Sequence, residues 1–460
     1  MNIKEKWAGW TVHETAMYGD QTERALRNFP ITGVAISHFP ELVNSLAMVK
    51  KACALTNRDL GSLTEEKCDA IVIACNEIMQ GLHHEHFVVD MIQGGAGTST
   101  NMNANEVIAN LALINMGHKK GEYQYLHPND DVNASQSTND VYPTALRLAV
   151  MQQVPHLLET QSELINAFFD RAQAFEGVLK VGRTQLQDAV PITVTSEFAS
   201  FANTMAEDIS RVKEVAELLC EVNLGGTAVG TGINTPKGYA PKVVGYLKEI
   251  SGYPLVGAKD LIEASSDLGG FVTFSSVLKR IAVKTSKICN DLRLLSSGPR
   301  AGIGEIILPT VQAGSSIMPG KVNPVIPEVV NQVAYQVIGS DLTVTMAAES
   351  GQLQLNAMEP VIIYNVMNSM RILTNAMHVL THRCVNGIEL DLERCNALLE
   401  NSLVSVTALV PVIGYERATQ IAKQALSSRR TVREVVLEQN ILTNEQMDDI
   451  FQADNLLGKK

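Results

Sequence analysis

The feature that most constrains the fold is a set of long apolar helical patterns between about residues 140 and 390. In one of them, apolar side chains recur at alternating steps of four and three residues, and Thr285 fills the single gap. This spacing is typical of helices packed nearly parallel to one another. The sequence Ser297-Gly298-Pro299 predicts where this helix ends. The repeating side chains are Phe274, Leu278, Ile281, Ile288, Leu292 and Leu295.

Four further stretches predict helices of similar length, at about 143–173, 190–222, 325–350 and 359–385, and Pro360 is placed to start or kink the last. Five helices of this length exceed what one compact bundle needs. The stretch VVNQVAYQVIGSDLTVTMAA carries few charges on any face, so we infer a homo-oligomer that buries these helices between subunits. The alternative is a large monomer that covers them with its own end domains.

The sequences on either side of this helical region have shorter helical patterns. Before it, QGGAGTST breaks regular structure ahead of the helical pattern NMNANEVIANLALINMG. After it, TVREVVLEQN and LTNEQMDDIF predict short amphipathic helices, the second opened by Thr443 and Glu445. We therefore expect a mainly α subunit with three domains: a mixed helical N-terminal domain (1–137), a central domain of long helices (138–393) and a small helical C-terminal domain (394–460).

Composition excludes several classes of protein. The formal net charge of −12 argues against a nucleic-acid-binding surface. No apolar run is long enough to span a bilayer, and MNIKEKWAGW lacks the apolar stretch of a secretion signal, so the expected location is the cytoplasm. The seven cysteines are an odd number without a CxxC pair, which predicts reduced thiols in the core and no zinc site.

Four short stretches concentrate hydroxyl and amide side chains: GTSTNMN (97–103), SQSTND (135–140), GRTQLQD (182–188) and GSSIMPGKVNP (314–324). Taken singly, each is explained by helix capping, with Asn139-Asp140 and Asp188 placed before helices. The same helix ends also hold carboxylates or phosphates well. The last stretch is not a nucleotide-binding P-loop, because five residues separate its two glycines and Val322 follows the lysine.

Together these four stretches resemble the aspartase/fumarase superfamily, and GSSIMPGKVNP is similar to its signature loop. NFPITG (28–33), LGGTAVGTGIN (224–234) and SSGPRAGIGEI (296–306) extend the resemblance over almost the whole chain. The resemblance implies a mainly α, three-domain subunit with a central five-helix bundle. It also implies a homotetramer with a twenty-helix core, in which three subunits build each active site.

Members of this superfamily remove a proton from the carbon beside a carboxylate and expel a group from the neighbouring carbon, which yields fumarate or a fumaryl product. The aci-carboxylate intermediate concentrates negative charge, so preorganised O–H and N–H donors are needed to stabilise it. The resemblance assigns this role to Thr98, Ser137, Thr138 and Ser316. It assigns the other carboxylate of the substrate to Lys321, Asn323, Thr184 and the backbone near Met318.

The resemblance also assigns Ser315 as the general base. A serine hydroxyl is too weak an acid to be ionised at neutral pH without help. Backbone N–H groups of the loop and the nearby Lys321 would stabilise the alkoxide, especially where water is excluded. Gly314 and Gly320 would then be the hinges of a loop that opens for substrate and closes for catalysis.

Gln185 separates the two candidate leaving groups. It stands where fumarases have a histidine that is paired with a glutamate. Glu328 matches that glutamate in this sequence. Loss of water from malate needs a proton donor, and glutamine cannot supply a proton. Gln185 therefore favours elimination of ammonia from L-aspartate, with Gln185, Asn139 and Thr98 holding the amino group. KGEYQYL (120–126) and GQLQLNAMEP (351–360) are also similar to aspartases. A class II fumarase and a non-catalytic structural relative remain the alternatives.

The resemblance implies no required cofactor and leaves activation by Mg²⁺ open. We interpret His83-His84-Glu85-His86 as a solvated helix end and not a metal site, because adjacent histidines do not share a helix face. His127, which matches a secondary carboxylate site of fumarases, is interpreted as a turn histidine. Of the family's N-terminal arm, only AMYGDQTERALRNFP, which contains Arg24, is recognisable.

Overall fold

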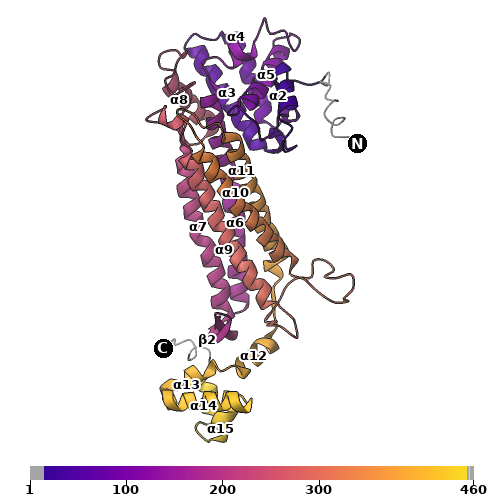
Figure 1. Cartoon of the computed structure of the whole chain (residues 1–460), viewed down its shortest axis with the longest axis vertical. Helices are drawn as coiled ribbons and strands as arrows, with labels where there is room; N and C mark the ends of the chain where they lie inside the picture. The colour runs from indigo at the N-terminus through magenta and orange to yellow at the C-terminus, as the bar shows by residue number, and fades with distance from the viewer. Residues whose placement is uncertain (1–14, 453–454, 456–460) are drawn as a thin grey trace. The chain divides into compact units, whose positions relative to one another are not determined.

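The computed structural model describes residues 15–452 and 455, and these residues form a mainly α protein, as predicted (Figure 1). They divide into two compact units. The first unit contains residues up to 158, 210–280 and 335–372, and the second contains 159–209, 281–334 and the described residues from 373 onward. Five long helices contribute residues to both units: α6 (Thr138–Ala174), α7 (Val194–Glu217), α9 (Gly269–Leu295), α10 (Val325–Glu349) and α11 (Glu359–Arg383).

The predicted long helices are confirmed, and so are their main signals. Every residue of the predicted seam on α9 is buried, and this includes Thr285. Helix α9 ends at Leu295, directly before the predicted stop, and Pro360 is the second residue of α11. Because the two compact units cut through these helices, the three domains expected at 1–137, 138–393 and 394–460 stay a prediction.

In the first unit, shorter helices build a core around α3, which packs against α4 and α8, while α5 packs against α4 and α2 (Figure 1). Their bounds are α2 (Asp20–Asn28), α3 (Pro40–Asp59), α4 (Glu65–Met79), α5 (Thr98–Asn115) and α8 (Tyr239–Ser251). The only sheet formed by described residues of this unit is the short parallel pair β3 (Glu221–Val222) and β4 (Val256–Gly257). Apolar side chains from one face of α3, such as Leu42, Leu46 and Cys53, are almost completely buried.

The predicted break before α5 has a steric cause at Gly97. This residue has a φ of 84°, a region that side chains other than glycine rarely adopt. A Cβ atom at this position would lie 2.2 Å from the ring of Tyr142. Only glycine fits here, and the chain turns directly into α5 at Thr98.

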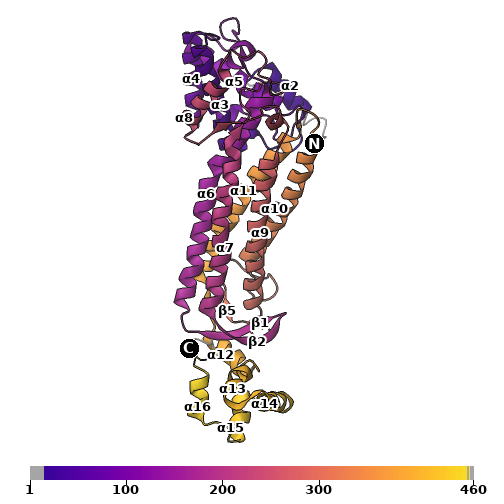
Figure 2. The same ribbon diagram turned by 90° about the vertical axis from the view of Figure 1, so that its left-hand side faces the viewer.

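The second unit ends in a group of five short helices (Figure 2). They are α12 (Leu392–Asn401), α13 (Ser405–Ile413), α14 (Tyr415–Ser428), α15 (Val432–Glu438) and α16 (Asn444–Ile450). Buried apolar side chains of α13 to α16 form one cluster that includes Leu409, Ile421, Val436 and Met447. Thr443 caps α16 in a reciprocal capping box with Gln446, so its prediction as the opening residue is confirmed.

The helix expected over 190–222 is wrong at its N-terminal end. Residues Leu179–Thr184 (β1) and Gln187–Thr193 (β2) pair as an antiparallel hairpin, and α7 begins only at Val194 (Figure 2). Gln185 and Leu186 have φ values of 52° and 61°, which matches the two-residue turns that suit the twist of a hairpin. Asp188 therefore lies in a strand and caps no helix, and its carboxylate accepts a hydrogen bond from the Ser402 hydroxyl at 2.6 Å.

Two whole-chain expectations can be compared with the structure. All seven cysteines are free thiols. Six are buried and Cys220 is half-buried, so the predicted core position is confirmed for six of them. Among the described residues, no single helix combines the length and apolar character needed to cross a bilayer. One bent pair, α12 with α13, meets these criteria only when its two helices are counted together.

Candidate active site

The SQSTND stretch forms the turn into α6 and is organised by Asp140. The backbone N–H of Ser137 donates to Asp140 Oδ1 at 2.9 Å, and the N–H of Asn139 donates to Ser137 Oγ at 3.3 Å. A serine before a helix with an acidic residue three positions later is the pattern of a capping box. The stretch caps α6 as expected, but α6 begins at Thr138, so Asn139 and Asp140 lie inside the helix and not before it. The cap fixes the backbone that presents Ser137, Thr138 and Asn139.

The other carboxylate oxygen of Asp140 holds the distant LGGTAVGTGIN stretch. It accepts the N–H groups of Gly225 at 2.9 Å and Thr227 at 3.2 Å. The Asn139 side chain donates to the carbonyl of Ala228 at 2.8 Å, which closes the contact from the other side. Asp140 is fully buried, and this burial raises its pKa to about 6 although the three N–H donors favour the charged form. Two polar stretches far apart in sequence therefore meet at one buried carboxylate.

A buried lysine supports the same turn from beneath. Lys50 Nζ on α3 donates to Asn133 Oδ1 at 3.0 Å and to Gln136 Oε1 at 2.8 Å. Complete burial lowers the pKa of Lys50 to about 8, against the opposing influence of nearby anionic groups. Asn101 on α5 donates to both Asn133 Oδ1 and Thr138 Oγ1 at 3.1 Å. Three elements thus fix the position of the hydroxyl-bearing turn.

The turn opens into a hollow of about 510 Å³ in the first unit. Its walls are the turn itself and the facing stretch from 227 to 234. The lining residues are Asn129, Asn133, Ala134, Ser135, Gln136, Ser137, Thr138, Thr227, Ala228, Ile233 and Asn234. Of the residues predicted to bind a carboxylate, Ser137 and Thr138 line this hollow.

Thr98 lies at the first position of α5 and is exposed. Its hydroxyl donates to the carbonyl of Gly95 at 2.7 Å. Asn101, which contacts Thr138, follows three positions later, and residues three apart lie on one face of a helix. The start of α5 is therefore tied to the start of α6, although Thr98 does not line the hollow described above.

In the second unit, Thr184 and Gln185 lie at the exposed tip of the β1–β2 hairpin. Strand β1 of this hairpin is held by a buried cluster of charges. Glu305, which is 1% exposed, lies 2.9 Å from both Lys180 Nζ and an Arg183 guanidinium nitrogen. Strand β1 is therefore anchored as far as Arg183, and Gln185 lies beyond this anchor in the exposed turn.

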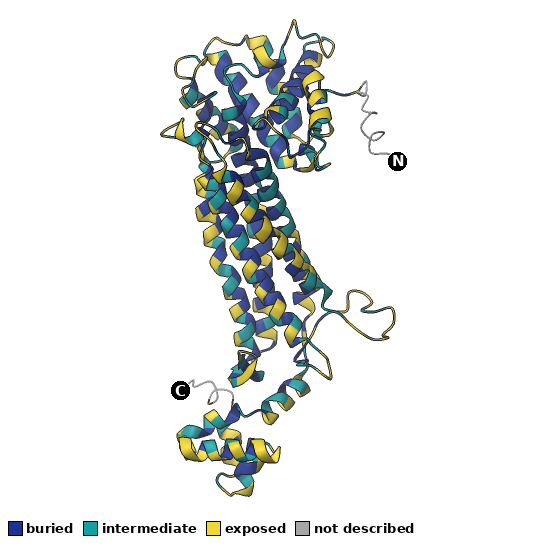
Figure 3. Cartoon of the chain, viewed as in Figure 1, coloured by how far each residue is buried: buried dark blue, intermediate teal, exposed yellow. Residues whose placement is uncertain are grey.

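The signature loop surrounds Ser315 with backbone donors. The N–H groups of Ile317 and Met318 both donate to Ser315 Oγ at 3.2 Å. The two ends of the loop meet, because the Asn323 side chain donates to the carbonyl of Gly314 at 2.5 Å. Beyond this neck the loop is largely exposed, with Ile317 at 82% (Figure 3).

Lys321 and Asn323 line a hollow of about 670 Å³ in the second unit. Its other walls include residues 296–299, from the SSGPRAGIGEI stretch that the resemblance had marked. Gly320 has a φ of 80°, and a Cβ atom there would meet no neighbour within 4 Å, whereas a Cβ at Gly314 would lie 2.0 Å from the carbonyl oxygen of Lys321. The two expected hinges thus need glycine for different reasons. Gly320 needs it for its left-handed backbone, and Gly314 needs it because the Lys321 carbonyl lies so close.

The predicted site residues fall into two groups. The first unit holds Thr98, Ser137, Thr138 and Asn139, and the second holds Thr184, Gln185, Gly314, Ser315, Ser316, Met318, Gly320, Lys321 and Asn323. Within each unit the structure brings several of them together, as described. That both groups serve one active site stays a prediction. Lys50 and the carboxylate of Asp140 were missed as supporting residues, although the spacing S-x-x-D carries a signal for the second.

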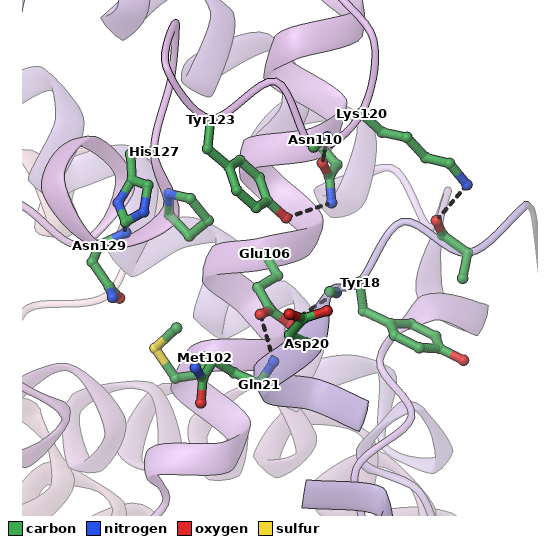
Figure 4. Close-up of a pocket in the computed structure, with 14 residues that line it drawn as sticks. Tyr18, Asp20, Gln21, Met102, Glu106, Asn110, Lys120, Tyr123, His127 and Asn129 are labelled. Carbon is green, nitrogen blue, oxygen red and sulfur yellow. Dashed lines mark hydrogen bonds between the residues drawn. The ribbon is translucent and has the colours of Figure 1, made fainter. Parts of the chain in front are cut away.

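The recognisable part of the N-terminal arm lines a further hollow of about 410 Å³ (Figure 4). Glu106 on α5 accepts the N–H groups of Gly19 and Gln21, both at 2.9 Å, and the hydroxyl of Thr22 at 2.6 Å. It therefore caps α2 from a distant helix. On the same wall, His127 Nδ1 accepts the N–H groups of Asn129 and Asp130, which confirms the turn histidine.

Two of the three histidines at 83–86 lie close together, contrary to the prediction that adjacent histidines do not share a face. His83 has a left-handed φ of 66°, and residues 84–86 form a 3₁₀ turn, in which positions three apart eclipse. The ligand atoms of His83, Glu85 and His86 consequently lie within 4.8 Å of one another. His84 points elsewhere and contacts the carbonyl of Ile78.

Long helices, a capped hydroxyl-bearing turn and an exposed Gly-Ser-Ser loop together define a lyase of the aspartase/fumarase type. The family model described as Lyase matches residues 9–339, and the one described as Fumarase C C-terminus matches residues 406–458. The chain therefore belongs to the aspartase/fumarase superfamily, as the resemblance implied.

Individual relatives agree over nearly the full length. The chain is 60% identical over 446 residues to an aspartate ammonia-lyase of Pseudomonas canavaninivorans. This match covers 97% of this chain and 94% of that protein. A crystal structure of fumarate lyase:delta crystallin from Brucella melitensis bound to cobalt has a TM-score of 0.94 at 58% identity, covering 98% and 97% of the two chains. A class II fumarase from Schistosoma mansoni has a TM-score of 0.91 at 33% identity, with the same coverage.

Proposed function

We propose that this chain is an aspartate ammonia-lyase, which converts L-aspartate reversibly to fumarate and ammonia by anti elimination. The observation that carries the proposal is the environment of Ser315, whose Oγ accepts two backbone N–H groups at 3.2 Å. Such donors stabilise negative charge on oxygen, and they do so most strongly when a closed loop excludes water. The 60% identity to an enzyme of that name supports the same reaction.

Ser315 acts in this proposal as the general base. Its alkoxide takes the proton from the β-carbon of aspartate, and the C–H electron pair moves into the adjacent carboxylate to give an aci-carboxylate. Collapse of this intermediate forms the carbon–carbon double bond, and the C–N electron pair leaves with ammonia. Lys321 contributes a positive charge near the loop, in a chain whose net charge of −12 would otherwise disfavour an anionic substrate.

The hydroxyl groups of Thr98, Ser137, Thr138 and Ser316 stabilise the aci-carboxylate in this scheme. Donors stabilise a transition state efficiently only if they are held in position before the reaction. The contacts of Asp140 and Lys50 supply that rigidity for the turn at 137–139. Thr184, Lys321, Asn323 and the Met318 backbone hold the second carboxylate.

Gln185 decides between ammonia and water as the leaving group. Because glutamine has no proton to give, hydroxide would leave without assistance, whereas the ammonium group of aspartate carries its own proton. Gln185, with Asn139 and Thr98, holds the amino group in this proposal. The fumarase alternative has weaker support, at 33% identity to a class II fumarase. A non-catalytic structural role is disfavoured because Ser315 and Lys321 are both present.

The active site is proposed to form in a homotetramer with a twenty-helix core, where three subunits supply residues. An exposed apolar stripe on α10 supports this assembly. Tyr335, Ile338, Leu342 and Met346 recur at steps of three and four, and their exposed fractions are 60%, 37%, 61% and 63%. An apolar stripe of this kind marks a surface that another chain covers. Light scattering of the purified protein tests the mass of four subunits, and Leu342→Arg should reduce it.

The proposed reaction requires no cofactor, and activation by Mg²⁺ is left open. The cytoplasm remains the expected location on the grounds given by the sequence.

The decisive experiment offers L-aspartate and L-malate separately to the purified protein and follows fumarate by its ultraviolet absorbance. The proposal expects fumarate from aspartate, together with one equivalent of ammonia, and at most a trace from malate. Fumarate from malate alone would establish the fumarase alternative. No fumarate from either substrate, with the tetramer intact, would favour a structural role.

A further inference from the structure

Three potential metal ligands converge on an exposed surface of the second unit, outside the residues proposed for catalysis. They are Glu163 on α6 and His378 and His382 on α11. One ligand atom from each residue lies within 4.8 Å of those of the other two. Glu163 Oε2 is 3.6 Å from His382 Nε2, and the two imidazole ring centres are 4.4 Å apart.

The arrangement follows from helical geometry. His378 and His382 are four positions apart near the C-terminal end of α11, so their side chains project from one face, one turn apart. Two histidines at this spacing on one helix are a known way to bind a metal ion. Glu163 comes from a different helix and approaches the pair with its carboxylate.

We propose that Glu163, His378 and His382 form a binding site for a divalent transition-metal ion of the Zn²⁺, Co²⁺ or Ni²⁺ type. Imidazole nitrogens suit these ions, whereas Mg²⁺ and Ca²⁺ prefer ligands that are all oxygen. Two histidines with one carboxylate supply three protein ligands and leave the remaining positions to water. The side chains of Glu163 and His382 are 46% and 45% exposed, so water reaches those positions.

The geometry needs only small side-chain movements to close around an ion. Bonds of about 2.0–2.1 Å in a tetrahedral site place ligand atoms roughly 3.3 Å apart. The present separations reach 4.8 Å at most, so a shift of about 1 Å through side-chain rotation is sufficient. All three residues are exposed. The partial negative charge at the C-terminus of α11 also favours a cation.

A simple ion pair explains the cluster less well. An exposed pair between His382 and Glu163 contributes only about 0–1 kcal/mol, and it does not involve His378. A bound ion gives all three side chains a partner and links α6 to α11. Its binding free energy would therefore stabilise the folded protein, without a part in the proposed chemistry.

Titration of untagged, metal-stripped protein with Co²⁺ tests this site, because cobalt bound to nitrogen ligands gives visible absorption bands. The starting variant is His83→Ala/His86→Ala, which removes the other cluster of histidines described above. In that variant we expect one Co²⁺ per subunit and a melting temperature that rises with Co²⁺ concentration. His378→Ala, His382→Ala and Glu163→Gln should each weaken Co²⁺ binding. Loss of a residue that only supports a metal ligand costs roughly 10- to 100-fold in metal affinity, and loss of a ligand itself should cost at least as much.

His156→Ala is the matched control, because His156 is an exposed histidine of α6 outside the cluster. It should leave Co²⁺ affinity and the thermal shift unchanged. Equal Co²⁺ affinity in the control and in all three ligand variants would overturn the proposal, as would failure of the starting variant to bind Co²⁺ at millimolar concentration. Since the three substitutions are at exposed positions, an unchanged melting temperature without metal confirms that each variant is folded.

Discussion

The turn at 135–140 and the signature loop at 314–324 carry similar polar side chains but are held in different ways. The turn is anchored from three sides, by Asp140, by Lys50 and by Asn101. The signature loop is closed at its neck by Asn323 and is otherwise mostly exposed. The turn is therefore held rigidly, whereas the signature loop makes few contacts with the rest of its own chain.

The difference fits the two tasks that an elimination sets. Stabilising an aci-carboxylate needs donors that do not move, because every reorganisation adds to the barrier. Delivering a base onto a substrate and releasing the product need a segment that opens, and such segments come from the less stable parts of a structure.

Ser315→Ala should reduce kcat by about 10⁴-fold, the upper range for loss of a general base. Its side chain belongs to the loop and supports no core, so the tetramer and the melting temperature should stay unchanged. Initial rates of fumarate formation and light scattering measure both quantities. A variant that loses assembly together with activity would show that the loop is structural, and the contrast would fail.

Asp140→Ala should lower the free energy of unfolding by about 3–5 kcal/mol, because three N–H groups lose their buried acceptor. Denaturant unfolding measures this change. The matched control is Asp130→Ala, whose side chain is 85% exposed and which should change stability by less than about 0.5 kcal/mol. Similar values for the two variants would contradict an anchored turn.

The stability of the turn should depend on pH. Burial raises the pKa of Asp140 from 3.8 to about 6, so between these values the folded protein binds more protons than the unfolded chain. Its stability relative to Asp140→Asn should therefore be greatest below pH 4 and fall by about 3 kcal/mol as the pH rises to 6.5. Unfolding of both proteins across this range gives the difference. A difference that is constant with pH would show that the pKa of Asp140 is the same in the folded and the unfolded protein.

Lys321→Ala should raise the KM for L-aspartate about 10- to 100-fold, which corresponds to loss of a charge-assisted hydrogen bond, and should change kcat much less. Lys423→Ala, at another exposed position of the second unit, is the control. Steady-state kinetics separate the two parameters. An unchanged KM would remove Lys321 from carboxylate binding.

The smallest effect is expected at Gly320. Its φ of 80° makes Gly320→Ala strained by about 1 kcal/mol, but the added carbon meets no neighbour within 4 Å. A loss of activity below about tenfold is therefore expected. Gly314→Ala should cost more, because its Cβ would press on the Lys321 carbonyl at 2.0 Å. The reverse order in fumarate assays would mean that backbone freedom at Gly320 limits the loop.

Local patterns predicted most of the fold because their causes are local. The spacing of apolar residues on α9 and the capping threonine of α16 act over a few positions, and both are confirmed. The hairpin at 179–193 was missed because its turn depends on left-handed backbone at Gln185 and Leu186, which neither residue type signals. The spacing of apolar residues alone therefore predicted a start for α7 that was too early in the sequence.

The site was predictable only in part for a similar reason. Its hydroxyl and amide residues came from a resemblance to a family, which identifies residue types but not their supports. Lys50 contacts Gln136 across 86 positions, and Asp140 contacts Thr227 across 87. No spacing rule connects residues so far apart. A buried lysine in an apolar helix becomes understandable only when the fold shows what it holds.

The exposure of the signature loop has a consequence for protein engineering. Ile317 is 82% exposed and Met318 is 49% exposed, so neither contributes much to the hydrophobic core of its own chain. Random libraries at 316–319 should therefore retain a high fraction of folded members. Loss of folded members is the usual bottleneck in directed evolution. Libraries at 137–139 would instead be depleted by misfolding. New substrate preferences are best sought first in the loop.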